Sequence, residues 1–254
     1  MSQSPLIGVV IPTWNAASTL QATLQALADL PPAIRGVLEV CVVDGGSTDR
    51  TLEVLASFAP SVDHVISQKD DGVYHAMNRG VARVRAPYVW FLGAGDLPRS
   101  LDLATMIERL QGTSTPTGHA CSVAALEPRE PGVPERFVPS WGTTLTWRNT
   151  IHHQGLVTPK SWLIDTPFEP QWKVLADYAW LLDQRNLGRR LNCHPDITLA
   201  EVPGGGLSRS FKAPLYLEEW RMKRQRLNAA ASACHAVWLP LKWAFKQASK
   251  AFRS

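Results

Sequence analysis

The sequence predicts an α/β fold in which helices flank a mostly parallel central sheet. Short β-branched runs predict strands over residues 6–11, 37–43, 62–66 and 87–92. Helix-length segments separate these runs, and turns rich in glycine or aspartate follow them. Strands that alternate with helices at this spacing are typical of βαβ units.

The first elements follow from local signals. The run 6–11 ends at Pro12, as a buried strand would, and Asn15 is expected to cap the next helix. The second strand ends at Asp44, two glycines follow, and a helix is expected around residues 52–58. One apolar face of the first helix is formed by Leu20, Leu24 and Leu27.

The fourth strand leads to a carboxylate that is well placed for chemistry. An acidic turn at Asp70–Asp71 precedes the expected helix 73–84, and Asp96 follows strand 87–92. Open α/β sheets bind ligands beyond the carboxyl ends of their strands. A carboxylate there suits Mg²⁺ or Mn²⁺, because hard cations take oxygen ligands and usually keep substrate phosphates among them.

The second half has a different pattern. Loops are expected around a short strand near 120–126, followed by a helix over 177–186 and a strand within 191–202. A long helical region is expected from about residue 214. We therefore expect a domain over 1–211, with halves 1–111 and 112–211, and a helical tail over 212–254.

Composition narrows the function classes. Of the 254 residues, 45% are hydrophobic and 19% charged, which is enough apolar material for a core and makes global disorder unexpected. The N-terminus lacks a signal-peptide pattern, and no apolar run has membrane-spanning length. The four cysteines are far apart, which argues against a zinc site or a disulfide framework and favours a reducing, cytoplasmic setting.

The basic charge is concentrated in the tail. The chain carries +4 overall, yet no acidic residue follows Glu219, whereas eight lysines and arginines do. A basic amphipathic helix suits an anionic membrane surface, so we expect peripheral attachment; a partner helix is the alternative, and nucleic acid is not expected. The apolar stripe comprises Trp238, Leu241, Phe245, Ala248 and Phe252, beside Lys242, Lys246 and Lys250.

Common nucleotide-binding loops are absent, since the sequence contains neither GxGxxG nor GxxxxGK[ST]. Asp44 has two interpretations, a ligand for a base or ribose and a residue that holds a tight turn. His152 and His153 lack a third zinc ligand at suitable spacing.

An ordered set of motifs nevertheless resembles family 2 glycosyltransferases of the GT-A nucleotide-diphospho-sugar transferase fold, and most of all the bacterial exopolysaccharide and O-antigen branch of colanic-acid type. The set runs over residues 6–208. Its members are VIPTWN at 10–15, VVDGGSTDRT at 42–51, DGVYHAMNRG at 71–80, FLGAGD at 91–96, IHHQG at 151–155, ADY at 176–178 and GGLS at 205–208.

The resemblance implies an inverting, metal-dependent enzyme that uses a nucleotide-sugar donor. The acceptor would be a glycan or glycolipid, commonly linked to polyprenyl diphosphate, at the inner face of the cell membrane. Matching positions imply a nucleotide pocket at Pro12, Thr13, Asn15 and Asp44, ribose and diphosphate contacts at Asp71 and Asn78, a metal ligand at Asp96, a catalytic base at Asp177, and diphosphate or acceptor contacts at His153, Gln154 and Ser208.

One departure from the family pattern affects the metal. Many members carry two aspartates in this motif, whereas Ala94 and Gly95 precede a single Asp96 here. One carboxylate suffices if donor phosphates and waters complete the coordination shell. The alternatives are a non-catalytic, membrane-associated binding protein and, less favoured, a nucleotidyltransferase, for which the sequence near Pro12 lacks the usual glycine-rich basic loop.

Overall fold

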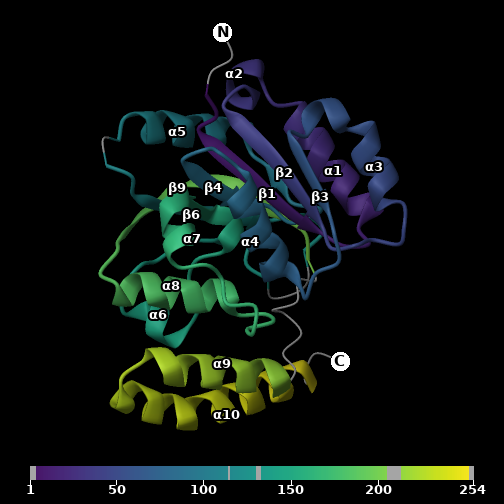
Figure 1. Ribbon diagram of the computed structural model, residues 1–254. Helices are drawn as coiled ribbons and strands as arrows, with labels where there is room; N and C mark the ends of the chain where they lie inside the picture. The colour runs from purple at the N-terminus through teal and green to yellow at the C-terminus, as the bar shows by residue number, and fades with distance from the viewer. Residues whose placement is uncertain (1–3, 114, 130–132, 205–212, 252–254) are drawn as a thin grey trace.

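The computed structural model describes residues 4–113, 115–129, 133–204 and 213–251, with side chains up to residue 244. It confirms the predicted α/β class: a central sheet is flanked by helices, and two C-terminal helices lie side by side beneath the rest (Figure 1). Within these residues the strands form one nine-stranded sheet in the order β3-β2-β1-β4-β8-β6-β9-β5, with β7 paired to β6.

The first half supplies the parallel part of the sheet. Strands β1, β2, β3 and β4 pair in parallel, and helices follow each of the first three. The elements are β1 (Ile7–Thr13), α1 (Ala17–Ala28), α2 (Pro32–Arg35), β2 (Leu38–Asp44), α3 (Thr51–Ser57), η1 (Ala59–Ser61), β3 (His64–Ser67), α4 (Val73–Arg83), β4 (Tyr88–Phe91), β5 (Leu97–Pro98) and α5 (Ser100–Gln111).

The second half extends the same sheet in mixed directions. Strand β8 pairs antiparallel with both β4 and β6, and β6 pairs in parallel with β9. The elements are β6 (Gly118–Ala125), β7 (Arg136–Phe137), α6 (Thr144–Trp147), η2 (His153–Gly155), β8 (Leu156–Pro159), α7 (Lys160–Asp165), α8 (Ala176–Asn186), β9 (Leu191–Val202), α9 (Ala213–Arg226) and α10 (Ala229–Ala251).

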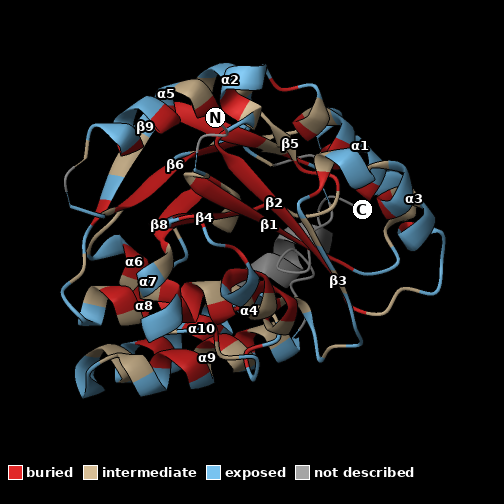
Figure 2. Cartoon of the chain, turned by 45° about the horizontal axis from the view of Figure 1, so that its top comes forward, coloured by how far each residue is buried: buried red, intermediate tan, exposed pale blue. Residues whose placement is uncertain are grey.

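Both faces of the sheet are covered. Figure 2 shows the central strands as a continuous buried band, and every residue of β1 and β2 is buried. Successive side chains point to opposite faces, so Val9 and Ile11 join one apolar cluster whereas Val10 joins the other. A strand buried on both sides reads as a continuous apolar run, which is why the sequence revealed these strands.

One local expectation is wrong. Asn15 does not cap α1, because Ala16 occupies the N-cap position without a side-chain hydrogen bond. Asn15 instead adopts a positive φ of 47°, and its Oδ1 accepts a hydrogen bond from the Thr48 amide at 2.8 Å. In the tail, the Lys242 ammonium contacts the Glu219 carboxylate at 3.0 Å.

The helices described here include none with the length and apolar character needed to cross a bilayer.

A buried carboxylate joins neighbouring strands near the amino ends of the parallel strands. Glu39 in β2 is 3% exposed and accepts hydrogen bonds from the amides of Arg85 and Ala86 and from the His64 ring. Burial alone would raise the pKa of Glu39, but these hydrogen bonds outweigh it and lower the pKa below its ordinary value. Glu39 thereby ties β2 to β3 and to the segment that enters β4.

We expect Glu39→Gln to destabilise the fold by about 1–3 kcal/mol near neutral pH, because the buried partners lose a charged acceptor. The pKa of Glu39 is lower in the folded state. The stabilisation is therefore complete above the unfolded-state pKa and is lost as the pH falls through the folded-state pKa.

Urea unfolding of wild type and variant from about pH 7 to about pH 3 measures this effect, and the difference should shrink toward acid. The control is Glu53→Gln, which removes an exposed pair with Arg50 and should change stability by less than about 0.5 kcal/mol. A difference that is constant across this range would contradict the assignment.

Candidate active site

A cleft of about 790 Å³ opens at the carboxyl edge of the parallel strands. The ends of β1 and β2 meet there with the loop that leads into α4, since parallel strands present their carboxyl ends at one edge. The cleft is lined by Pro12, Thr13, Trp14, Gly45, Gly46, Thr48, Lys69, Asp70, Asp71, Gly72, Val73, Ala76 and Lys173.

Asp44 lies buried behind the glycine turn that lines the cleft. It is fully buried, and its carboxylate accepts hydrogen bonds from the amides of Gly46 and Ser47 and from the hydroxyls of Ser47 and Ser67. Gly46 has a φ of 84°, a left-handed conformation that favours glycine. The carboxylate therefore holds the glycine turn in place, and its predicted contact with a nucleotide stays a prediction.

Pro12, Thr13 and Asp71 line the cleft, whereas Asn15 lies beside it through its bond to Thr48. The Thr13 hydroxyl is buried and has no hydrogen-bond partner in the described part of the chain. A buried polar group without a partner is costly, so this hydroxyl is available to a ligand.

Asn78 is not among the lining residues. Its amide exchanges two hydrogen bonds with the backbone of Phe168, at 2.7 and 3.0 Å, and so joins α4 to the second half. Its predicted contact with ribose or diphosphate stays a prediction. Ser208 lies outside the described residues.

Three lining residues with large or charged side chains were not predicted as site residues. Trp14 is 67% exposed at the cleft, and Lys69 and Lys173 add two cationic side chains. Trp14 could have been noticed, because it directly follows a buried strand at the edge of the sheet where ligands bind. Lys173 carried no signal, since it reaches the cleft only through the tertiary fold, where its ammonium contacts the Asp71 carbonyl at 3.1 Å.

Beside the cleft, four predicted residues converge from three parts of the chain. Asp96 is buried, and the side chains of His153 and Gln154 lie near enough to lower its pKa against the effect of burial. The His153 Nδ1 atom lies 3.3 Å from the Asp177 carboxylate. Asp96 and Asp177, 81 positions apart, are thus linked through the adjacent residues His153 and Gln154.

Close packing fixes the position of the His153–Gln154 pair. The Trp90 Nε1 atom in β4 donates a hydrogen bond to the Gln154 carbonyl at 2.7 Å. On the other side, a Cβ atom at Gly155 would lie 2.3 Å from the Cys121 carbonyl oxygen. Only glycine fits there, so η2 lies directly against β6 and carries its side chains to Asp96.

Tyr74 links the cleft to Asp177. Its hydroxyl contacts the Asp177 carboxylate at 3.1 Å and the Val174 carbonyl at 2.8 Å. Burial and the nearby negative charge of Asp177 raise the pKa of Tyr74 well above its ordinary value, so this hydroxyl stays protonated. Asp177 itself lies in the first turn of α8, as the sequence predicted.

Asp96 is a buried carboxylate that could bind a metal ion. Burial raises its pKa, which shows that its charge is poorly compensated, although it accepts a hydrogen bond from the Gly93 amide. The Gln154 Oε1 atom is also buried without a partner in the described structure.

In the described residues no cluster of three His, Cys, Asp or Glu side chains could hold a metal by itself. The residues therefore fit a hard divalent cation only if phosphate oxygens or waters complete its coordination shell.

Sequence comparisons found a matching family and named relatives. The family model described as Glycosyl transferase family 2 matches residues 8–155. A PGL/p-HBAD biosynthesis glycosyltransferase of Mycobacterium bovis is 36% identical over 185 residues, which cover 69% of this chain and 68% of the relative. A validoxylamine A glucosyltransferase of Streptomyces hygroscopicus is 40% identical over 99 residues, or 38% of this chain and 23% of the relative.

Solved structures share the fold at low identity. S. aureus TarS residues 1–349 in complex with UDP-GlcNAc superposes with a TM-score of 0.68 at 17% identity, covering 89% of this chain and 69% of that one. A mannosyltransferase from Pyrobaculum calidifontis in complex with GDP-Man and Mn²⁺ gives 0.66 at 18% identity, covering 99% and 76%. The GT-A-like fold is therefore confirmed.

The expected colanic-acid branch is not supported. Relatives that share two thirds of their length with this chain include the mycobacterial PGL/p-HBAD biosynthesis glycosyltransferases. The family itself rests on a model match over more than half of the chain and on these relatives, and both agree with the motif order. The chain belongs to glycosyl transferase family 2.

Proposed function

We propose that this protein is an inverting glycosyltransferase that moves a sugar from a nucleotide-diphosphate donor to a glycan or glycolipid hydroxyl. The observation that carries the proposal is the convergence of Asp96 and Asp177 beside a cleft at the carboxyl edge of the sheet. Residues 1–111 would bind most of the donor, residues 112–211 would bind the acceptor and add Lys173 and Gln154 to the donor site, and 212–254 would form the tail.

The cleft suits the donor nucleotide. Trp14 offers a ring for a base, and Asp71 and the Thr13 hydroxyl offer hydrogen bonds to base or ribose. The diphosphate would lie near the start of α4, where helix amides favour anions, with Lys69 and Lys173 supplying positive charge.

Asp96, with Gln154 beside it, would hold Mg²⁺ or Mn²⁺ together with the donor diphosphate. When bound, the metal would act as a Lewis acid for the departing nucleoside diphosphate. The cationic lysines of the cleft would share that task, which suits a site with a single metal-binding carboxylate.

Asp177 would act as the general base. The acceptor oxygen attacks the anomeric carbon, its proton passes to the Asp177 carboxylate, and the bond from that carbon to the diphosphate oxygen breaks. A single displacement inverts the configuration at the sugar carbon. His153 and the protonated Tyr74 hydroxyl, both in contact with the carboxylate, would orient it.

A lipid-linked acceptor, such as a polyprenyl-diphosphate glycan, would place the reaction at the cytoplasmic face of the membrane. The basic apolar tail supports this part of the proposal.

Replacing the proposed base tests the mechanism. Asp177→Asn should lower kcat about 10²–10⁴-fold, because the general base is removed while the shape is kept. Donor binding, followed by thermal shift with UDP or GDP, should be unchanged. Asp165→Asn changes an exposed carboxylate of α7 and serves as the control. Transfer by Asp177→Asn at the wild-type rate would refute the assignment.

Metal and donor should bind together. Calorimetry should detect only weak Mn²⁺ binding by the free protein and about tenfold or more tighter binding in the presence of the nucleoside diphosphate that the cleft accepts, because phosphates complete the site. Asp96→Asn should remove this enhancement. Tight binding of Mn²⁺ without nucleotide would contradict the proposal.

Lys173 should contribute to donor affinity. Lys173→Met should raise the donor KM about tenfold, because a charge-assisted contact with the diphosphate is lost. Lys173→Arg keeps the charge and should recover most of the affinity. Steady-state kinetics with the donor varied measures both, and equal KM values for Met and Arg variants would exclude an electrostatic role.

A further inference from the structure

Helices α9 and α10 form a hairpin that packs on the second half of the molecule. The two helices lie side by side (Figure 1), and α9 also contacts α8. Where the hairpin packs on the rest of the chain, the fully buried Lys223 ammonium bonds to the Glu219 carboxylate and the Trp147 carbonyl. The Lys242 ammonium also contacts the Glu219 carboxylate. This polar network anchors the hairpin, and the buried Arg226 guanidinium adds ion pairs with Glu169 and Asp183.

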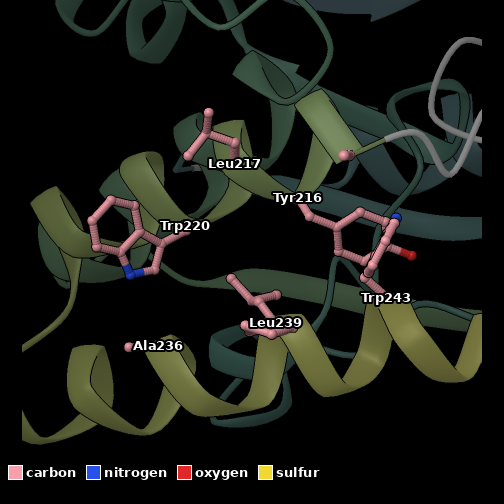
Figure 3. Close-up of a pocket in the computed structure, with 8 residues that line it drawn as sticks. Tyr216, Leu217, Trp220, Ala236, Leu239 and Trp243 are labelled. Carbon is pink, nitrogen blue, oxygen red and sulfur yellow. The ribbon is translucent and has the colours of Figure 1, made fainter.

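Away from this network, the space between the two helices is lined by apolar side chains. A groove of about 410 Å³ runs between the two helices, and Figure 3 shows side chains from both helices around it. The Tyr216 hydroxyl on its wall is buried and has no partner among the described atoms. The groove is lined by Ala213, Tyr216, Leu217, Trp220, Ala236, Leu239, Pro240 and Trp243.

The apolar surface continues onto the outer face of α10. Val237, Trp238 and Leu241 are 67%, 46% and 60% exposed. They share one helix face, because residues three and four positions apart lie one above the other. A surface this apolar marks an interaction site, since soluble proteins seldom expose contiguous patches of this kind.

The charged side chains of the hairpin indicate which kind of surface it would bind. Of the hairpin's two acids, Glu219 is paired with lysines, and Glu218 accepts hydrogen bonds from the Val174 and Leu175 amides. Arg221 and Arg224 are exposed one turn beyond Leu217 and Trp220 of the groove, and no acid follows Glu219 in the sequence. Because both acids already have partners, the exposed charges beside the groove are positive. Positive charge beside an apolar surface complements an anionic bilayer.

We propose that the groove between α9 and α10, together with the outer face of α10, docks on an anionic lipid bilayer and takes lipid hydrocarbon into the groove. The proposed function enters only in the expectation of a lipid-linked acceptor; bilayer binding itself does not depend on it. The Glu218 bonds to Val174 and Leu175 connect the docked hairpin to the segment that leads to Asp177, so docking brings the acceptor half to the membrane.

Vesicle sedimentation of the full chain tests the proposal. Wild type should bind vesicles of phosphatidylcholine mixed with phosphatidylglycerol and bind phosphatidylcholine alone at least about fivefold more weakly. The double variant Trp238→Ser/Leu241→Ser should bind the mixed vesicles at least about tenfold more weakly, because both exposed side chains lose burial in lipid. Arg221→Glu/Arg224→Glu should lose most of the preference for anionic lipid.

Leu101→Ser is the matched control, because Leu101 on α5 is 85% exposed yet lies outside the hairpin. It should bind vesicles as wild type does. Equal binding by the Trp238/Leu241 variant overturns the proposal. Absence of vesicle binding by wild type, with concentration-dependent self-association in light scattering, also overturns it and assigns the groove to a second copy of the chain.

Thermal shift with nucleoside diphosphates, measured on the same variants, separates the two claims. Retained nucleotide stabilisation in a variant that no longer binds vesicles supports a docking role for the hairpin. Vesicle binding by a wild-type protein that no nucleotide stabilises would refute the proposed function and leave the docking surface intact.

Discussion

The antiparallel pairing of β4 with β8 is the contact on which the candidate active site depends. Strand β4 leads to Asp96, and β8 directly follows η2, which carries His153 and Gln154. Pairing the two strands brings these residues to the same edge of the sheet. Trp90 reinforces the junction by its hydrogen bond to the Gln154 carbonyl, so the two halves of the chain meet as one continuous sheet.

The two candidate carboxylates differ in environment, and this difference suits different roles. Asp96 is buried with a raised pKa, so a cation beside it would relieve a real electrostatic cost. Asp177 instead lies among a His153 ring, a Tyr74 hydroxyl and a helix start, groups that hold it in one orientation. In many enzymes, two acidic groups in different surroundings have different pKa values and therefore take different catalytic roles.

Much of the molecule could be read from the sequence, because the signals were local. Strands β1, β2 and β4 are apolar runs; Asp44 ends β2, and Asp96 follows β4 in the chain itself. The candidate site was predictable only in part. The structure brings together Asp96, His153, Gln154 and Asp177, as predicted. Asn78, however, hydrogen-bonds the Phe168 backbone, and Lys173 lines the cleft although no sequence motif indicated it.

The sequence alone determined the strand and helix alternation, the family and the aspartates at strand ends, because each depends on neighbouring residues or on motif order. Only the tertiary structure decided which distant side chains meet. Asp177 reaches His153 through packing of α8, and Lys242 reaches Glu219 through packing of α10 against α9. Periodicity gives the relative directions of side chains on a helix, whereas the direction of the whole helix is set by what it packs against.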